Sequence, residues 1–207
     1  MIAAALAAGS RLICGASVRW HCDPSATTQR IYYGNHSSHL DFVMIWSALP
    51  PRLRRSARPV AGRDYWDRGA LRRYLAGRVF RAVLIDRGRA GTDNAQASAT
   101  AAIEQMAEQM GDQYSLIVFP EGTRSSNGLV GPFKSGLYHL SRLRPDVELV
   151  PVYLENLNRI LPKGESLPVP MMSRVIFGPA FAADSGHDKA AFLQKARDAL
   201  MQLKDAR

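Results

Sequence analysis

Short apolar runs alternate along this chain with longer helical segments, and this alternation constrains the fold more than any other feature. Residues 82–85 form a compact apolar run that is typical of a buried strand. Further strands are predicted at 31–34, 59–62, 115–119, 147–154 and 175–177, and helices at 39–49, 65–77, 92–110, 134–143 and 188–204. The pattern predicts an α/β fold in which a mostly parallel central sheet is covered by helices.

The length of the chain, 207 residues, suits one domain over residues 1–207, with the informative motifs between 30 and 180. The run 2–18 is apolar, but Arg11 interrupts it, and a membrane span needs roughly 20 apolar residues. It also lacks the basic start of a signal peptide. Residues 1–22 are therefore predicted to hold a helix that lies in a membrane interface or packs on the domain.

The charge of the chain is strongly basic, with 27 basic against 18 acidic residues. Most of the basic residues are Arg, whose planar fork suits phosphate, so nucleic acid, anionic lipid and coenzyme A all fit as partners. The stretch 52–81 alone contains ten Arg. It is predicted to lie on an anionic membrane or line a phosphate pocket, although a solvated helix face or Arg-rich codon usage would give the same composition. The sequence shows no recognisable nucleic-acid motif, and nucleic-acid binding remains an alternative.

His36 and Asp41 are a candidate base and its partner, five residues apart. On a continuous helix five residues turn about 500°, so the two meet only if His36 lies in the entering loop. Ser38 suits the N-cap, which would place Asp41 in the first turn, but the same pattern also indicates a capping box with no further role. If the pair meets, the imidazole can take a proton from an alcohol while the carboxylate fixes its tautomer.

A second candidate site follows the strand predicted at 115–119. Glu121 supplies a carboxylate, Gly122 lets the backbone approach a ligand, and Thr123 and Arg124 add a hydroxyl and a phosphate-shaped fork. A polar turn with a surface Arg is the alternative. Because ligands collect at the carboxyl ends of parallel strands, this segment is expected to lie near His36.

Three weaker candidates are Arg87, which follows the run 82–85, Lys134 at a helix start, and Pro151 within an apolar strand. A turn residue and a surface charge are the alternatives for Arg87 and Lys134. Metal ligation is a further alternative for the histidines and acids of the two main segments, but their spacing fits no common zinc motif, so no metal is predicted. No Gly-x-Ser-x-Gly elbow is present, and direct attack by an acceptor hydroxyl is the simpler chemistry.

Taken in order, four segments resemble the four blocks of the glycerolipid acyltransferase family. His36 and Asp41 match its H-x4-D motif, residues 84–87 are similar to the second block, residues 119–124 match F-P-E-G-T-R, and residues 150–152 resemble an apolar V-P-V strand. The resemblance implies the family's α/β fold. It also implies transfer of a fatty acyl chain from acyl-CoA or acyl carrier protein to the free hydroxyl of lysophosphatidate, forming phosphatidate.

The resemblance also implies roles for individual residues. His36 would deprotonate the acceptor while Asp41 orients it, and Pro151 would shape the acyl site. The phosphorylated acceptor would be bound by Arg87, Glu121, Gly122, Thr123 and Arg124, with Lys134 as a further candidate. No cofactor is expected besides the thioester co-substrate, and no nucleic acid. The enzyme is expected at the cytoplasmic face of a membrane, bound peripherally or monotopically, although the chain departs from the common family pattern by lacking a long hydrophobic N-terminal helix. Another lysophospholipid or a lyso-aminolipid is the alternative acceptor. A metal-dependent hydrolase is a more distant alternative for the function of the chain.

Overall fold

A computed structural model of the chain describes residues 2–86, 95–125, 127–160, 169, 171–183 and 188–205. Within these residues one sheet has the strand order β1-β7-β6-β2-β5-β3-β4, with β8 beside β6. The strands are β1 (Ala16–Trp20), β2 (Arg30–Gly34), β3 (Ala57–Gly62), β4 (Val83–Ile85), β5 (Ser115–Val118), β6 (Glu148–Glu155), β7 (Ser173–Phe177) and β8 (Phe181–Ala182).

The sheet is mostly parallel, as the sequence predicts. Strand β2 runs parallel to both β5 and β6, β3 runs parallel to β4 and β5, and β1 runs parallel to β7. Strand β6 pairs in the antiparallel direction with β7 and β8. The central strands β2 and β5 are buried along their whole length, which agrees with their continuous apolar runs.

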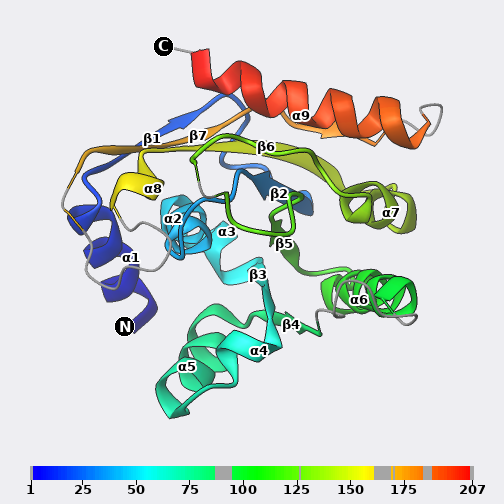
Figure 1. Cartoon of the computed structure of the whole chain (residues 1–207). Coiled ribbons are helices and arrows are strands. Elements are labelled where there is room, and N and C mark those ends of the chain that lie inside the picture. Colours follow the sequence, from blue (N-terminus) through cyan, green and yellow to red (C-terminus); the bar gives the residue numbers. More distant parts are fainter. Residues whose placement is uncertain are drawn as a thin grey trace.

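Helices cover both faces of the sheet (Figure 1). Successive side chains of a strand point to opposite faces, so Tyr32 packs on one side with helices α1 and α2, while Ile31 and Tyr33 pack on the other with α6, α7 and α9. The helical segments are α1 (Ile2–Ile13), α2 (Asp41–Ala48), α3 (Pro51–Ser56), α4 (Arg63–Trp66), α5 (Ala70–Tyr74), the π-helical η1 (Leu75–Phe80), α6 (Ala95–Met110), α7 (Gly136–Leu143), α8 (Leu157–Ile160) and α9 (Lys189–Asp205).

Two predicted helices differ from the expectation, one by being divided and the other by ending early. The helix predicted at 65–77 is divided into α4, α5 and η1, because Gly69 adopts a φ of +87°, which no right-handed helix can contain. The N-terminal helix ends at Ile13, and after Gly15, with a φ of +47°, the chain enters edge strand β1. Part of the predicted helix 92–110 (residues 92–94) lies outside the described residues. Among the described helices, none is both long and apolar enough to cross a bilayer.

Candidate active site

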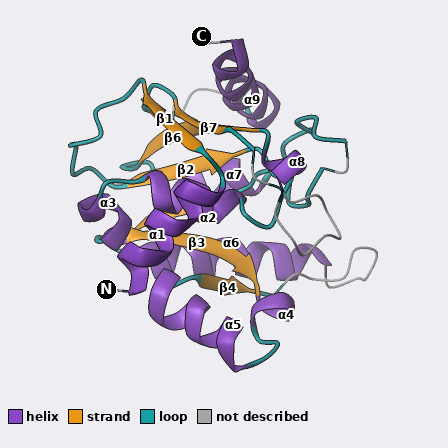
Figure 2. Cartoon of the chain, turned by 90° about the vertical axis from the view of Figure 1, so that its left-hand side faces the viewer, coloured by secondary structure: helices purple, strands orange, loops and turns teal. Residues whose placement is uncertain are grey.

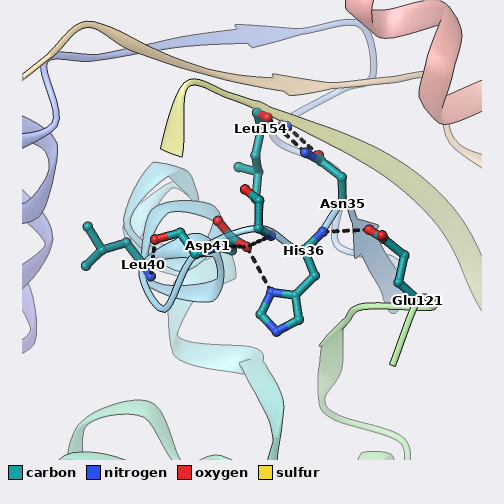
Figure 3. A network of polar contacts seen from close by, with 8 residues as sticks. Asn35, His36, Leu40, Asp41, Glu121 and Leu154 are labelled. Atoms are coloured by element: carbon teal, nitrogen blue, oxygen red, sulfur yellow. Dashed lines mark hydrogen bonds and ion pairs between the residues drawn. The ribbon is translucent and has the colours of Figure 1, made fainter. Parts of the chain in front are cut away.

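Adjacent parallel strands bring the two main motifs together. Strand β2 leads into His36 and its neighbour β5 leads into Glu121, with Tyr33 of β2 in register with Val118 of β5. Because both strands run in the same direction, their carboxyl ends meet at one edge of the sheet. Figure 2 views the molecule from the side on which α1, α2 and α5 lie in front of the strands, and Figure 3 shows the junction itself.

The side chains of His36 and Asp41 meet in the loop between β2 and α2 (Figure 3). Nδ1 of His36 lies 2.8 Å from Oδ2 of Asp41, whose side chain is fully buried, whereas 17% of the His36 side chain is exposed. Since Nδ1–H donates its hydrogen bond to the carboxylate, the neutral ring carries its lone pair on Nε2. The arrangement is that of an oriented imidazole able to accept a proton at Nε2.

The same carboxylate also holds the start of α2. Oδ2 of Asp41 accepts the backbone N–H groups of Ser37 at 2.6 Å and Ser38 at 2.8 Å, and Oγ of Ser38 accepts the Leu40 N–H at 3.2 Å. These bonds do not form a capping box, because Oγ of Ser38 bonds the N–H of Leu40 and not that of Asp41, and the N-cap position of α2 is Leu40, which makes no side-chain cap bond. The prediction of Ser38 as the N-cap is therefore wrong, but Asp41 does lie in the first turn, where one carboxylate both holds the loop before α2 and orients the imidazole.

Neighbouring segments fix the His36 ring and backbone. The ring stacks on Phe119, with centroids 4.2 Å apart and planes at 17°. The His36 N–H donates to Oε1 of Glu121 at 2.8 Å, and its carbonyl accepts the Ser125 N–H at 2.7 Å. Both ends of the 119–125 segment are thus tied to the histidine.

Glu121 is buried, and both of its carboxylate oxygens are bonded to backbone. Oε1 accepts the His36 N–H, and Oε2 accepts the Gly131 N–H at 2.9 Å. A substrate-binding role for this residue stays a prediction. The structure also shows a structural role that the sequence did not indicate, because the Glu121 carboxylate joins the loop at His36 to the loop at Gly131.

Gly122 and Lys134 lie against each other beside Glu121. Gly122 has a φ of +70°, and a Cβ at this position would lie 3.0 Å from the Lys134 side chain. The Lys134 N–H donates to the Pro120 carbonyl at 2.9 Å, which brings the lysine to this turn. Glycine therefore permits both the backbone conformation and the close approach of an ammonium group.

Arg124 gives the site a cationic side. It is partly buried, and its Nη1 has no hydrogen-bond partner among the described residues, while Thr123 is exposed. The pKa of His39 is lowered, first by burial and then by the nearby charges of Arg124, His36 and Arg72. The two guanidinium groups of Arg124 and Arg72 favour an anionic ligand here.

A second aromatic contact brings the Arg-rich stretch to the site. His39 stacks on Tyr65 with centroids 5.0 Å apart, and the Arg72 guanidinium lies 4.3 Å above the same Tyr65 ring. Sequence reasoning noted the composition of residues 52–81 but assigned no site role to Tyr65 or Arg72. Within the described part of the chain, no three His, Cys, Asp or Glu side chains gather as a metal site.

Asn35 is a positioning residue that the sequence analysis missed. Its buried amide donates to the Leu154 carbonyl at 2.9 Å and accepts the Leu154 N–H at 2.8 Å (Figure 3). The side chain thereby continues the pairing of β2 with β6 beyond the end of β2. Its place directly before His36 at a strand end was the available signal.

The remaining predicted residues lie further from the imidazole or outside the described chain. Pro151 is buried on β6 in register with Tyr33, and its ring packs close to Gly178. Its role in shaping an acyl site stays a prediction. Arg87 lies outside the described residues, and the preceding Asp86 pairs with Arg63 at 3.2 Å.

Comparison with known proteins adds sequence and fold similarity. A family model described as Acyltransferase matches residues 21–155. The chain is 32% identical to 1-acyl-sn-glycerol-3-phosphate acyltransferase alpha of Mus musculus over 67% of this chain and 45% of that protein. It is 34% identical to the Homo sapiens protein over 61% and 40%, so it spans less than half the length of either relative. The crystal structure of a 1-acyl-sn-glycerophosphate acyltransferase from Thermotoga maritima shares the fold, with a TM-score of 0.73 at 16% identity, covering 99% of this chain and 78% of that one.

Proposed function

The chain belongs to the glycerolipid acyltransferase family, and we propose on that basis that it transfers a fatty acyl group from a thioester to the free hydroxyl of lysophosphatidate. The product is phosphatidate. The observation that carries the proposal is the His36–Asp41 contact of 2.8 Å at the same sheet edge as Arg124. A base for an alcohol and a cation for a phosphate then serve a single acceptor molecule.

The reaction follows from the orientation of the imidazole. Nε2 of His36 takes the proton of the acceptor hydroxyl as its oxygen attacks the thioester carbonyl carbon. The buried carboxylate of Asp41 stabilises the imidazolium that forms. When the tetrahedral intermediate collapses, the carbon–sulfur bond breaks and the leaving thiolate takes the proton back from Nε2. The ester is then complete and the histidine is neutral again.

Both substrates are defined by chemical class. The donor is acyl-CoA or acyl carrier protein, and the mechanism uses no additional cofactor. The acceptor is a lysophospholipid whose phosphate lies toward Arg124, with Lys134 and Arg72 adding positive charge nearby. Another lysophospholipid or a lyso-aminolipid would use the same base, so the acceptor must be established by experiment.

A panel of acceptors tests this proposal. The purified protein is incubated with radiolabelled acyl-CoA, and separately with radiolabelled acyl-acyl carrier protein, and each donor is offered in turn lysophosphatidate, lysophosphatidylcholine, lysophosphatidylethanolamine and a lyso-aminolipid. We expect label to enter phosphatidate fastest. Faster labelling of another product would assign a different acceptor, and labelling of no lipid from either donor type would overturn the acyltransferase proposal.

Replacing Arg124 with Ala is expected to weaken acceptor binding selectively. Loss of a charge-assisted hydrogen bond to phosphate costs about 1.5–3 kcal/mol, or roughly 10–100-fold in the KM for lysophosphatidate. The KM for acyl-CoA should change little. Arg19→Ala is the matched control, because Arg19 is exposed on β1, which β7 and β6 separate from β2. Equal increases in both KM values for Arg124→Ala would contradict the phosphate role.

An anionic membrane is the proposed surface on which the enzyme works. Helix α5 exposes 70% of Leu71 and 46% of Tyr74 beside its arginines, and η1, which follows it, contacts α1, where Leu12 is 83% exposed. Apolar side chains flanked by basic ones suit anionic headgroups. We propose peripheral or monotopic attachment through this side, at the cytoplasmic face.

Vesicle sedimentation checks the surface. Binding should be stronger to phosphatidylglycerol-containing vesicles than to phosphatidylcholine vesicles and should fall with added salt. Leu71→Ser should weaken it by about tenfold, since burying one leucine contributes about 1.5–3 kcal/mol. Leu143→Ser on α7 is the control. Leu143 is another exposed leucine, at 50%, but it lies on the other side of the sheet. Equal losses in the two variants would exclude α5 as the contact.

A further inference from the structure

A chain of hydrogen bonds joins the C-terminal helix α9 to the catalytic loop. Arg197, partly buried on α9, donates from Nη2 to the Val130 carbonyl at 3.0 Å and from Nε to the Gly131 carbonyl at 3.3 Å. The guanidinium therefore holds two consecutive carbonyls with its planar fork. Arg197 lies outside residues 21–155, which match the family model, and outside all four sequence motifs.

The next contacts lead to His36. The Gly131 N–H donates to Oε2 of Glu121 at 2.9 Å, and Oε1 of the same carboxylate accepts the His36 N–H at 2.8 Å. A Cβ on Gly131 would lie only 3.1 Å from Oε2, so the loop backbone and the carboxylate are closely apposed. The path from the Arg197 guanidinium to the His36 backbone therefore passes through two residues, Gly131 and Glu121.

The loop that Arg197 holds also supports the turn at Gly122. It continues to Lys134, whose N–H donates to the Pro120 carbonyl and whose side chain lies over Gly122. On its other side, an open cavity of about 320 Å³ separates parts of Pro132 and Phe133 from α9. Packing fixes the inner side of this loop, because Val130 and Phe133 lie against the core, and the polar contacts of Arg197 fix the side that faces α9.

We propose that Arg197 is a positioning residue for acyl transfer. By fixing the backbone of Val130 and Gly131 it sets the place of Glu121, and through Glu121 the place of the His36 ring. The activity test of this inference rests on the proposed function of the His36 site. Since the base must lie within hydrogen-bond reach of the attacking hydroxyl, a small displacement lowers turnover more than binding.

The kinetic test compares three variants of α9. Arg197→Ala is expected to lower kcat by about 10–100-fold with little change in either KM, because a displacement near 1 Å can cost about that much. Arg197→Lys keeps the positive charge but loses the planar fork that reaches both carbonyls, so it should recover only part of the loss. Lys195→Ala removes an exposed positive charge two residues away on the same helix and should leave kcat unchanged. A thermal melt of each variant accompanies the kinetics.

Amide hydrogen exchange supplies a readout that needs no turnover. In Arg197→Ala the N–H groups of Gly131 and His36 should exchange faster, while that of Leu116 in the central strand β5 keeps its protection. This result supports the positioning of Glu121 and His36 by Arg197 even if the wild type transfers no acyl group, an outcome that would refute the proposed function but not this structural role. Unchanged exchange with unchanged kcat, or faster exchange throughout the sheet with an equally lowered melting temperature, would overturn it.

Discussion

His36→Ala is expected to lower kcat by about 10²–10⁴-fold, the usual contribution of a positioned general base. The protein should remain folded, because the backbone of His36 makes the contacts with Glu121 and Ser125, and these do not require the ring. The substitution removes the stacking on Phe119 and the bond to Asp41. Rates are measured with radiolabelled acyl-CoA and lysophosphatidate, and folding by circular dichroism.

The matched control for this variant is His139→Ala. His139 is exposed on α7, so its loss should leave kcat at the wild-type value. A folded His36→Ala protein that turns over at the wild-type rate would show that another group accepts the proton.

Asp41→Asn should lower kcat by a similar factor, about 10²–10⁴-fold, for an electrostatic reason. Three donors converge on Oδ2 of Asp41, from the His36 ring and from the N–H groups of Ser37 and Ser38. An amide oxygen can still accept backbone hydrogen bonds, but it carries no charge to stabilise the imidazolium. We therefore expect a large loss of turnover with a loss of stability of only about 0.3–1 kcal/mol from the missing charge at the start of α2.

Asp41→Ala separates the two roles of this carboxylate. It leaves the N–H groups of Ser37 and Ser38 without their acceptor, at a cost of about 1–3 kcal/mol for each unsatisfied buried group. Urea unfolding should place Asp41→Ala well below Asp41→Asn in stability, while both have low kcat. If Asp41→Asn retained full activity, Asp41 would serve only to hold the loop before α2.

Local patterns predicted much of the fold and of the site. Strands β2, β5 and β6 and the helix after His36 are each one uninterrupted segment of the sequence. The local pattern of apolar side chains is therefore enough to identify them. The meeting of His36 with Asp41 required only that the histidine precede the helix, which is where it lies. Because both motifs follow predicted strands of a mostly parallel sheet, they were expected at one edge, and the parallel pairing of β2 with β5 confirms it.

Long-range contacts were beyond the reach of sequence reasoning. No local pattern relates the residues of three such contacts. These are the hydrogen bond of Asn35 to Leu154, the bonds of Glu121 to two backbone N–H groups, and the hydrogen bond of Arg197 to the Val130 carbonyl. Strand β1 was missed for a different reason. It alternates intermediate and exposed positions at the edge of the sheet, and its residues continue an apolar run that favours helix. The break at Gly69 was missed because the predicted helix 65–77 runs through this residue, whose φ of +87° interrupts it.

The central claim is that the imidazole of His36 acts as a base toward a lipid hydroxyl and forms no bond to the acyl group. Intact-protein mass spectrometry of the enzyme mixed with acyl-CoA, before and after addition of lysophosphatidate, measures this most directly. We expect an unchanged protein mass throughout, with free thiol released only after the acceptor is added. A protein that gains the mass of one acyl chain in the absence of acceptor, and then passes it to lysophosphatidate, would contradict it.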